Sequence, residues 1–141
     1  MGKKVKIITI IIFLLLLAGG STWFFLFKKE GKAEEVKEPS IDEVVESSVN
    51  MDDVTTNLSS ENYIKMSFTL QTNSKEAKEE LTKREFQVRD LMIKQLSNMK
   101  VEQFRGKEGI SSLEQMLKEE INSLMQEGKV VKIYTTSKII Q

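Results

Sequence analysis

The 141-residue sequence contains no cysteine and no histidine, and its only proline is Pro39. The first two absences exclude disulfide bonds, thiol nucleophiles, zinc fingers and imidazole acid–base catalysis. They do not indicate a compartment, because reduced cytosolic proteins and exported proteins without disulfides share them. A chain of this length forms at most one domain with appended segments.

The sequence also lacks a concentrated basic region. Its 21 basic and 21 acidic residues give a formal net charge of zero. Lys3, Lys4 and Lys6 precede the first apolar segment, whereas every acidic residue follows residue 27, so the rest of the chain is mildly acidic. Nucleic-acid binding requires a concentrated positive surface, and we therefore expect no nucleic-acid partner.

The pattern of carboxylates gives no support for catalysis. Adjacent carboxylates occur among other places at Asp52-Asp53, Glu79-Glu80 and Glu119-Glu120. Neighbouring helix residues point about 100° apart, so the glutamate pairs do not converge as an acid–base dyad does. The aspartate pair lacks the staggered ligands of a calcium loop, and no glycine-rich phosphate loop follows a strand. We therefore predict no catalytic, cofactor-binding or metal-binding residue, no cofactor, no small-molecule substrate and no enzymatic activity.

A long hydrophobic run lies near the N-terminus. Residues 7–27, IITIIIFLLLLAGGSTWFFLF, contain no charge. As a helix, this segment matches a hydrocarbon core of about 30 Å. A cleaved signal peptide is the alternative, because Ala18 and the two glycines after it resemble a cleavage site. The apolar run continues past that point to Phe27 and stops at Lys28, which favours an uncleaved transmembrane helix.

The orientation of this helix is not decided by charge alone, since lysines flank both of its ends. The short N-terminus carries only positive charge, and the segment is similar to an export signal that is not cut. We therefore predict a basic cytoplasmic tip at residues 1–6 and an extracytoplasmic C-terminal domain at the cell inner or plasma membrane. Within the helix, the small residues Ala18, Gly19 and Thr22 would let another helix approach closely, unless they have no specific role.

Beyond the membrane segment, the composition changes twice. Residues 28–48 are strongly charged and contain the only proline, which predicts a linker. Residues 49–141 have the pattern of a folded domain. Its first two strands are predicted at residues 51–58 and 62–70, the second with the alternation of a half-buried strand.

Two amphipathic helices are predicted after these strands. A single helix at residues 75–98 has apolar residues at steps of three and four, and Phe86 lies off this stripe. A second helix begins near Ile110, and we expect Gly128 to end it in a left-handed conformation. The connection and the start of this helix are marked by the breakers Gly106 and Gly109 and by Ser111 or Ser112 as the cap.

The sequence closes with GKVVKIYTTSKIIQ, which predicts a last strand. Simple alternation would place one set of its side chains on one face, namely Val131, Ile133, Thr135, Ser137 and Ile139. The order β-β-α-α-β indicates an α+β domain of two layers, in which an antiparallel or mixed sheet is covered on one face by the two amphipathic helices. We expect the closing strand to be paired along its length.

The second half of the chain resembles the FliL family of flagellar basal-body-associated proteins. The ordered positions that carry this resemblance are Arg89-Asp90, Leu96-Ser97, Glu108-Gly109, Leu113, Ile121-Asn122, Gly128, Val130 and Ile140-Gln141. The resemblance covers residues 49–141 and the anchor-plus-linker organisation before them. Residues 135–138, Thr-Thr-Ser-Lys, depart from the aromatic-acidic run that family members often have there.

The resemblance implies a non-enzymatic role beside the flagellar motor. Members of the family associate with the MotA–MotB stator, support torque and swarming, and carry a domain resembling the stomatin-like domain. A homo-oligomeric ring of extracytoplasmic domains around the stator is therefore expected. From their positions we expect structural roles for the motif residues, with a partner site as the alternative for the first two: Arg89, Asp90, Glu108, Gly109, Gly128 and Gln141. A generic single-pass protein whose outer domain is a scaffold or binds a ligand is the alternative.

Overall fold

The computed structural model describes Gly2 and residues 38–141. The predicted basic tip, the transmembrane helix with Ala18, Gly19 and Thr22, and most of the predicted linker lie outside the described residues. In the part of the chain that is described, no helix has both the length and the apolar character needed to cross a membrane. A compact unit runs from Pro39 to Gln141, so the ordered domain begins ten residues before the predicted start at Val49.

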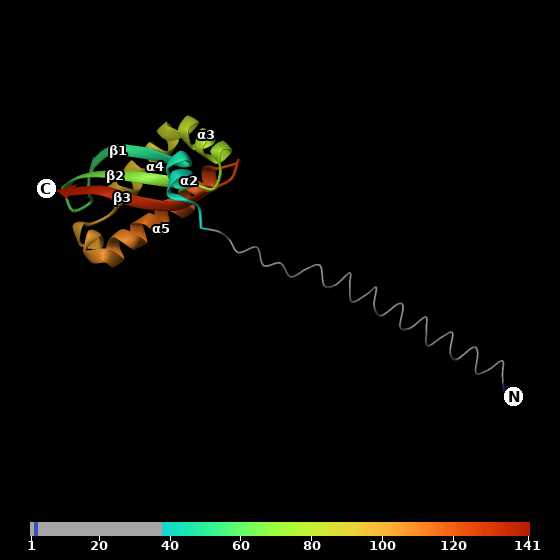
Figure 1. The fold of residues 1–141 in the computed structure, drawn as a ribbon. Coiled ribbons are helices and arrows are strands. Elements are labelled where there is room, and N and C mark those ends of the chain that lie inside the picture. Colours follow the sequence, from blue (N-terminus) through green and yellow to red (C-terminus); the bar gives the residue numbers. More distant parts are fainter. Residues whose placement is uncertain (1, 3–37) are drawn as a thin grey trace. The chain divides into compact units, whose positions relative to one another are not determined.

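The domain is built on a three-stranded antiparallel sheet in the order β1-β2-β3 (Figure 1). The strands are β1 at Ser48–Asn57, β2 at Tyr63–Thr72 and β3 at Val130–Ile140. The central strand β2 follows the predicted alternation from Tyr63 to Leu70, since its buried apolar side chains are Ile64, Met66, Phe68 and Leu70. The α+β prediction is therefore confirmed, with an antiparallel sheet.

Helices cover one face of this sheet (Figure 1). The helical elements are α2 at Ile41–Glu46, α3 at Lys75–Lys83, α4 at Glu85–Asn98, the 3-10 helix η1 at Val101–Phe104 and α5 at Gly106–Leu124. The prediction of one helix at residues 75–98 is wrong, because the chain breaks at Arg84 between α3 and α4. The buried residues Leu81 and Val88 are seven positions apart, which is about two helical turns. One continuous helix would therefore bury the same apolar stripe as α3 and α4 do, and the pattern of apolar residues does not reveal the break.

The start and end of α5 also differ from the prediction. The helix begins at Gly106, so Gly109 lies inside its first turns and does not break an irregular connection. Ser111 and Ser112 are helix-interior residues, and the residue at the N-cap is Arg105, which makes no side-chain capping bond. The helix ends at Leu124, so Gly128 belongs to the following turn rather than to the helix end.

The strict alternation predicted for β3 is wrong because β3 contains two irregularities. The register passes from Ser67 opposite Ser137 to Phe68 opposite Thr135, which leaves Thr136 as an extra residue. A second shift leaves Val131 unpaired in the register at the start of the strand. Each extra residue reverses the phase of the side chains that follow. Thr135 and Lys138 consequently lie opposite core residues of β2, whereas Ser137 lies on the other face.

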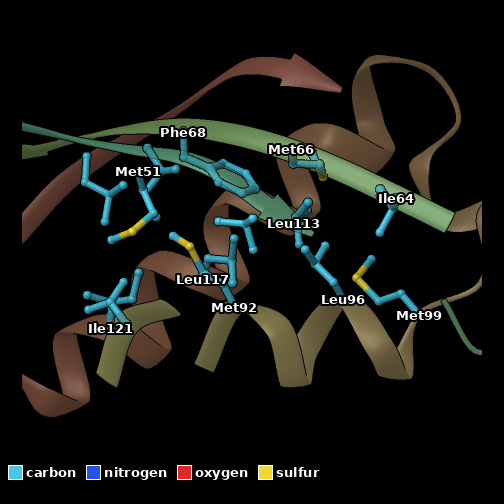
Figure 2. Close-up of a cluster of buried hydrophobic side chains, with 14 of the residues drawn as sticks. Met51, Ile64, Met66, Phe68, Met92, Leu96, Met99, Leu113, Leu117 and Ile121 are labelled. Atoms are coloured by element: carbon cyan, nitrogen blue, oxygen red, sulfur yellow. The ribbon is translucent and has the colours of Figure 1, made fainter. Parts of the chain in front are cut away.

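The core lies between the sheet and helices α4 and α5. Phe68 projects from β2 toward Met92 and Leu96 of α4 and Leu117 of α5 (Figure 2). Met51, Met66 and Met92 are fully buried. Methionine fills irregular space between differently shaped surfaces. At the last residue, the backbone of Gln141 exchanges two hydrogen bonds of 2.9 Å with Tyr63, so β3 is paired to its end as predicted.

Candidate functional site

Arg89 lies on α4, where the structure places it against a bulge in β1. Its guanidinium donates to the main-chain oxygen of Asp52 at 3.0 Å and to the carboxylate of Glu85 at 3.2 Å. The bulge arises because Asp52 and Asp53 together oppose a single residue of β2, and Asp53 has a φ of 53°. The carbonyl freed by the bulge is thus the acceptor for Arg89, which ties α4 to the sheet.

Asp90 points away from the sheet. Its carboxylate forms an ion pair with Lys94 at 2.7 Å, one helical turn further on, and its side chain is largely exposed. Such pairs on a helix surface are worth only a few tenths of a kcal/mol, about 0.3–0.5. Arg89 and Asp90 are therefore adjacent in sequence but face different surroundings.

Two further motif positions fasten the helices to the strands. The hydroxyl of Ser97 on α4 lies 2.9 Å from that of Thr56 on β1. On α5, the side-chain amide of Asn122 donates to the main-chain oxygen of Val130 at 2.9 Å and accepts from its N–H at 2.7 Å. Asn122 thus pairs with the first residue of β3 as a neighbouring strand would.

Glu108 and Gly109 lie in the first turns of α5. A carboxylate there is favoured by the partial positive charge of a helix N-terminus. At Gly109, a Cβ atom would collide with the main-chain carbonyl of Gln103 in η1. The residue allows α5 to leave η1 in close contact with it.

Gly128 has the left-handed conformation that was predicted, with a φ of +75°. A Cβ atom at this position would lie 2.5 Å from the side-chain oxygen of Asn73 and 2.9 Å from Ala77. The same Asn73 oxygen accepts from the N–H of Lys129 at 2.8 Å. The turn before β3 is therefore packed closely on the start of α3.

Glu80 on α3 was not identified as important from the sequence. Its carboxylate accepts main-chain N–H groups from Gln126 at 2.9 Å and Glu127 at 2.6 Å, and it pairs with Arg84 at 2.6 Å. The hydrogen bond from Glu127 is the main reason why the pKa of Glu80 lies below its ordinary value of 4.5, and the bonds from Gln126 and Arg84 act in the same direction against desolvation. No local pattern signals this contact, because the residues lie more than forty positions apart.

The segment that departs from the family pattern, residues 135–138, lies on the edge strand β3. The N–H of Thr135 donates to the carboxylate of Glu114 on α5 at 2.9 Å. The ammonium of Lys138 donates to the carbonyl of Phe104, at the end of η1, at 3.0 Å. An acidic side chain in the place of Lys138 could not make that bond. Glu114 also occupies one donor of a free sheet edge, which discourages unwanted strand pairing.

The face of the sheet opposite the helices, here called the open face, is mainly polar. Its central row is formed by Tyr63, Lys65, Ser67 and Thr69, and the neighbouring strands add Asp53, Lys132, Tyr134 and Ile139. Lys65 forms an ion pair with Asp53 at 2.8 Å. The hydrogen bond to Asp53 raises the pKa of Lys65 above its usual 10.5.

A groove lies on the outer side of the helical layer, and we call it the α4–α5 groove. It encloses about 690 Å³ and is lined by Phe86, Gln87, Asp90, Leu91, Lys94, Gln95 and Leu124. Its apolar part comes from Phe86, Leu91 and Leu124. Phe86 is 71% exposed, which is unusual for an aromatic side chain without a partner.

The described residues contain no arrangement suited to catalysis. They include no group of three or more potential metal ligands. The paired carboxylates are separately engaged: Glu119 accepts from Gln115 and Glu120 from Gln95. The features suited to function are the exposed surfaces, namely the open face and the α4–α5 groove.

Comparison with known proteins agrees with these features. Residues 48–141 match the family model described as "Flagellar basal body-associated protein FliL". The chain is also 46% identical over 114 residues to the flagellar protein FliL of Bacillus subtilis (strain 168), which covers 81% of this chain and 80% of that protein. The matched region begins at the first residue of β1 and includes the whole sheet and the helices that cover it.

Proposed function

Because this chain belongs to the FliL family of flagellar basal body-associated proteins, we propose that it associates with the MotA–MotB stator of the flagellar motor. There it supports stator engagement, torque and swimming or swarming motility. The protein is not an enzyme, as its family is a family of non-enzymatic flagellar proteins. The observation that carries the proposal is the match over residues 48–141, because it spans nearly all of the compact domain.

In this proposal the domain stands outside the cell membrane. Residues 7–27 cross the cell inner or plasma membrane with the basic tip in the cytoplasm, and the charged linker sets the distance between membrane and domain. Ala18, Gly19 and Thr22 form the side of the membrane helix that packs on another helix. Several copies of the domain form a ring around the stator. The hydropathy and charge of the first 38 residues support this arrangement, as does the stomatin-like resemblance of the family.

The contacts of the motif residues support a division of labour within the domain. We propose that Arg89, Gly109 and Gly128 are structural, as are Asp90, Glu108 and Gln141. Arg89 is engaged with the main chain of β1, and Gly128 lies against the start of α3. Partner contacts then belong to the surfaces that remain exposed, the open face and the α4–α5 groove.

The test combines deletion with crosslinking in cells. Deletion of the gene is expected to impair swimming in viscous medium or swarming on agar while filaments still assemble. A photo-crosslinking residue on the domain, placed at an exposed position such as Lys132, is expected to capture MotB. The matched control carries the same group at Lys4, in the predicted cytoplasmic tip. Normal motility at high load together with no stator crosslink from any exposed position would overturn the proposal.

A further inference from the structure

Helix α2 differs from the other helices of the described domain in how it is attached. Each of the others buries at least one side chain, and even the four-residue η1 buries Phe104. Helix α2 buries none, since Ile41 and Val45 are exposed and Val44 is only half-buried. Among the described residues, the core and the side chains that pack against it include none from α2. Burial of apolar surface therefore contributes little to holding α2 in place.

The side-chain contacts that join α2 to the helical layer are polar and involve one of its residues. The main-chain oxygen of Glu46, the last residue of α2, accepts a hydrogen bond of 2.8 Å from the ammonium group of Lys78. The carboxylate of Glu46 forms an ion pair of 3.1 Å with Lys75, and both of these side chains are more than half exposed. Exposed ion pairs contribute little to stability. Within the described part of the chain, two lysines of α3 thus hold α2 to this layer.

The remaining bonds of α2 lie within its own segment. Ser40 and Glu43 form a capping box, with bonds of 3.3 Å and 2.7 Å. The hydroxyls of Ser47 and Ser48 donate to the main-chain oxygens of Glu43 and Val44, at 2.7 Å and 2.6 Å. A helix of six residues is not stable by itself, because so few bonds do not offset the entropy lost on ordering it. These local bonds favour the helix while it is docked but do not maintain it once it is released.

The chain becomes firmly attached one residue after α2. The main-chain oxygen of Ser47 accepts from the N–H of Thr72 at 2.9 Å and from its hydroxyl at 2.7 Å. Thr72 is buried, and Ser48 is already paired with Gln71 in the sheet. Helix α2 lies at this end of β2 (Figure 1). The boundary between weakly and strongly held backbone therefore lies at Ser47.

We propose that α2 is a detachable segment, which leaves the domain by turning about Ser47 while the sheet and the other helices stay folded. Local unfolding of this kind selects segments with few buried contacts. Six residues span about 9 Å as a helix and about 20 Å when extended, a difference of about 11 Å. Under the proposed function, this length adds to the distance that the linker spans from the membrane. Detachment itself does not depend on that function.

Hydrogen exchange of the full-length chain in detergent, followed residue by residue by NMR, tests the detachment. The N–H of Val44 donates to Ser40 inside α2, whereas the N–H of Thr72 donates to Ser47 at the boundary. We expect Val44 to exchange about a hundredfold faster than Thr72, because detachment removes only the acceptor of Val44. Equal protection of the two N–H groups would overturn the proposal.

A double variant tests whether the two lysines of α3 control the detachment. In Lys75→Ala/Lys78→Ala, exchange at Val44 is expected to accelerate by about tenfold, because both attachments of Glu46 are lost. Exchange at Thr72 should stay unchanged, since the boundary contact is kept. Lys83→Ala, in the last turn of the same helix, is the matched control and should change neither rate. An unaltered rate at Val44 in the double variant would contradict the proposal.

A proline substitution distinguishes a detachable helix from one that the domain requires. Val44→Pro removes the N–H that donates to Ser40 and prevents α2 from forming as a helix. We expect exchange at Thr72, and at the buried Val54 of β1, to remain within about threefold of the wild-type rates. Rapid exchange at Val54 in this variant would show that the sheet depends on α2 and would overturn the proposal. These measurements are independent of stator association, which is judged by the MotB crosslink.

Discussion

The two faces of the sheet differ in what their residues do. On the covered face, Phe68 is fully buried among side chains of α4 and α5 (Figure 2). On the open face, its neighbours Ser67 and Thr69 are half-exposed and make single hydrogen bonds to β1. Motif residues such as Arg89 and Asn122 connect helices to strands on the covered side. The comparison teaches that these motif residues hold helices and strands of the domain together, and under the proposed function contacts with partners belong to exposed residues outside them.

The largest difference in stability between the two faces is expected when the largest side chain of the covered face is removed. Phe68→Ala is expected to lower the free energy of unfolding by about 3–5 kcal/mol, because it removes buried area and leaves a cavity. Thr69→Ala, on the adjacent residue of the open face, should cost less than about 1 kcal/mol. Urea denaturation of a fragment spanning Pro39–Gln141, followed by circular dichroism, measures both. Equal losses for the two variants would contradict the comparison.

A smaller effect is expected at the turn that leads from the helical layer into the sheet. Gly128→Ala should cost about 2–3 kcal/mol, since it adds a left-handed alanine and a clash with Asn73. Gly106→Ala is the matched control, because its φ is +66° but no heavy atom lies within 4 Å of the added Cβ. That variant should cost only about 1 kcal/mol from the backbone alone. The difference between their denaturation midpoints isolates the steric contact, and a difference of zero would disprove it.

The tie between α5 and β3 is expected to be weaker still. Asn122→Ala removes two hydrogen bonds to the main chain of Val130 and should destabilise the domain by about 1–2 kcal/mol. Hydrogen exchange at the N–H of Val130 should accelerate more than exchange in β2, because the opening is local. Ser111→Ala, at an exposed position of the same helix, is the control and should change neither quantity. Unaltered exchange at Val130 in the Asn122 variant would refute the role of this amide.

Lowering the pH should destabilise the domain through Glu80, which lies in the helical layer on the covered side of the sheet. Its folded pKa is lowered, so its contribution is present above the unfolded value of 4.5 and is lost as the pH falls through the lower folded value. Glu80→Gln should therefore destabilise the domain at pH 7 and make its stability less dependent on pH below 4.5. Denaturation curves at pH 7, 5 and 3 test this, with Glu79→Gln, a more exposed neighbour, as the control. Parallel pH profiles for the two variants would argue against the contact with Gln126 and Glu127.

The smallest effect is expected for the ion pair on the open face. The raised pKa of Lys65 implies a contribution that is present below pH 10.5 and is lost as the pH rises through the higher folded value. Asp53→Asn should remove this alkaline dependence, and added salt should reduce the effect of the substitution at neutral pH. Asn tolerates the left-handed conformation of this residue, so the backbone is preserved. A large, salt-independent loss would show that the open face contributes more to stability than the comparison allows.

Much of the fold could be predicted from local patterns. The alternation in β2 identified all of its core residues, because that strand contains no bulge of its own. Helix α2 was not predicted, although Ser40 and Glu43 have the spacing of a capping box. The many charged residues around them favoured the prediction of a linker instead. The break at Arg84 was hidden by the seven-residue spacing of Leu81 and Val88.

Other features depend on contacts that no local pattern contains. The extra residue Thr136 in β3 is defined only by pairing with β2, and it decides which face Lys138 occupies. The carboxylate of Glu80 finds its donors more than forty residues away. In the same way, the α4–α5 groove was not predicted, because it depends on how Leu124 of α5 lies beside Phe86 and Leu91 of α4.

The central claim is that residues of the covered face hold the domain together whereas exposed apolar residues outside the core carry its motor function. The most direct test is to complement a strain lacking the gene with Phe86→Asp, in parallel with Ser111→Asp at an exposed polar position of α5, and to measure swimming in viscous medium. We predict that both variants accumulate in the membrane like the wild type, that Ser111→Asp restores swimming and that Phe86→Asp does not. Full restoration by Phe86→Asp at wild-type abundance would contradict the account.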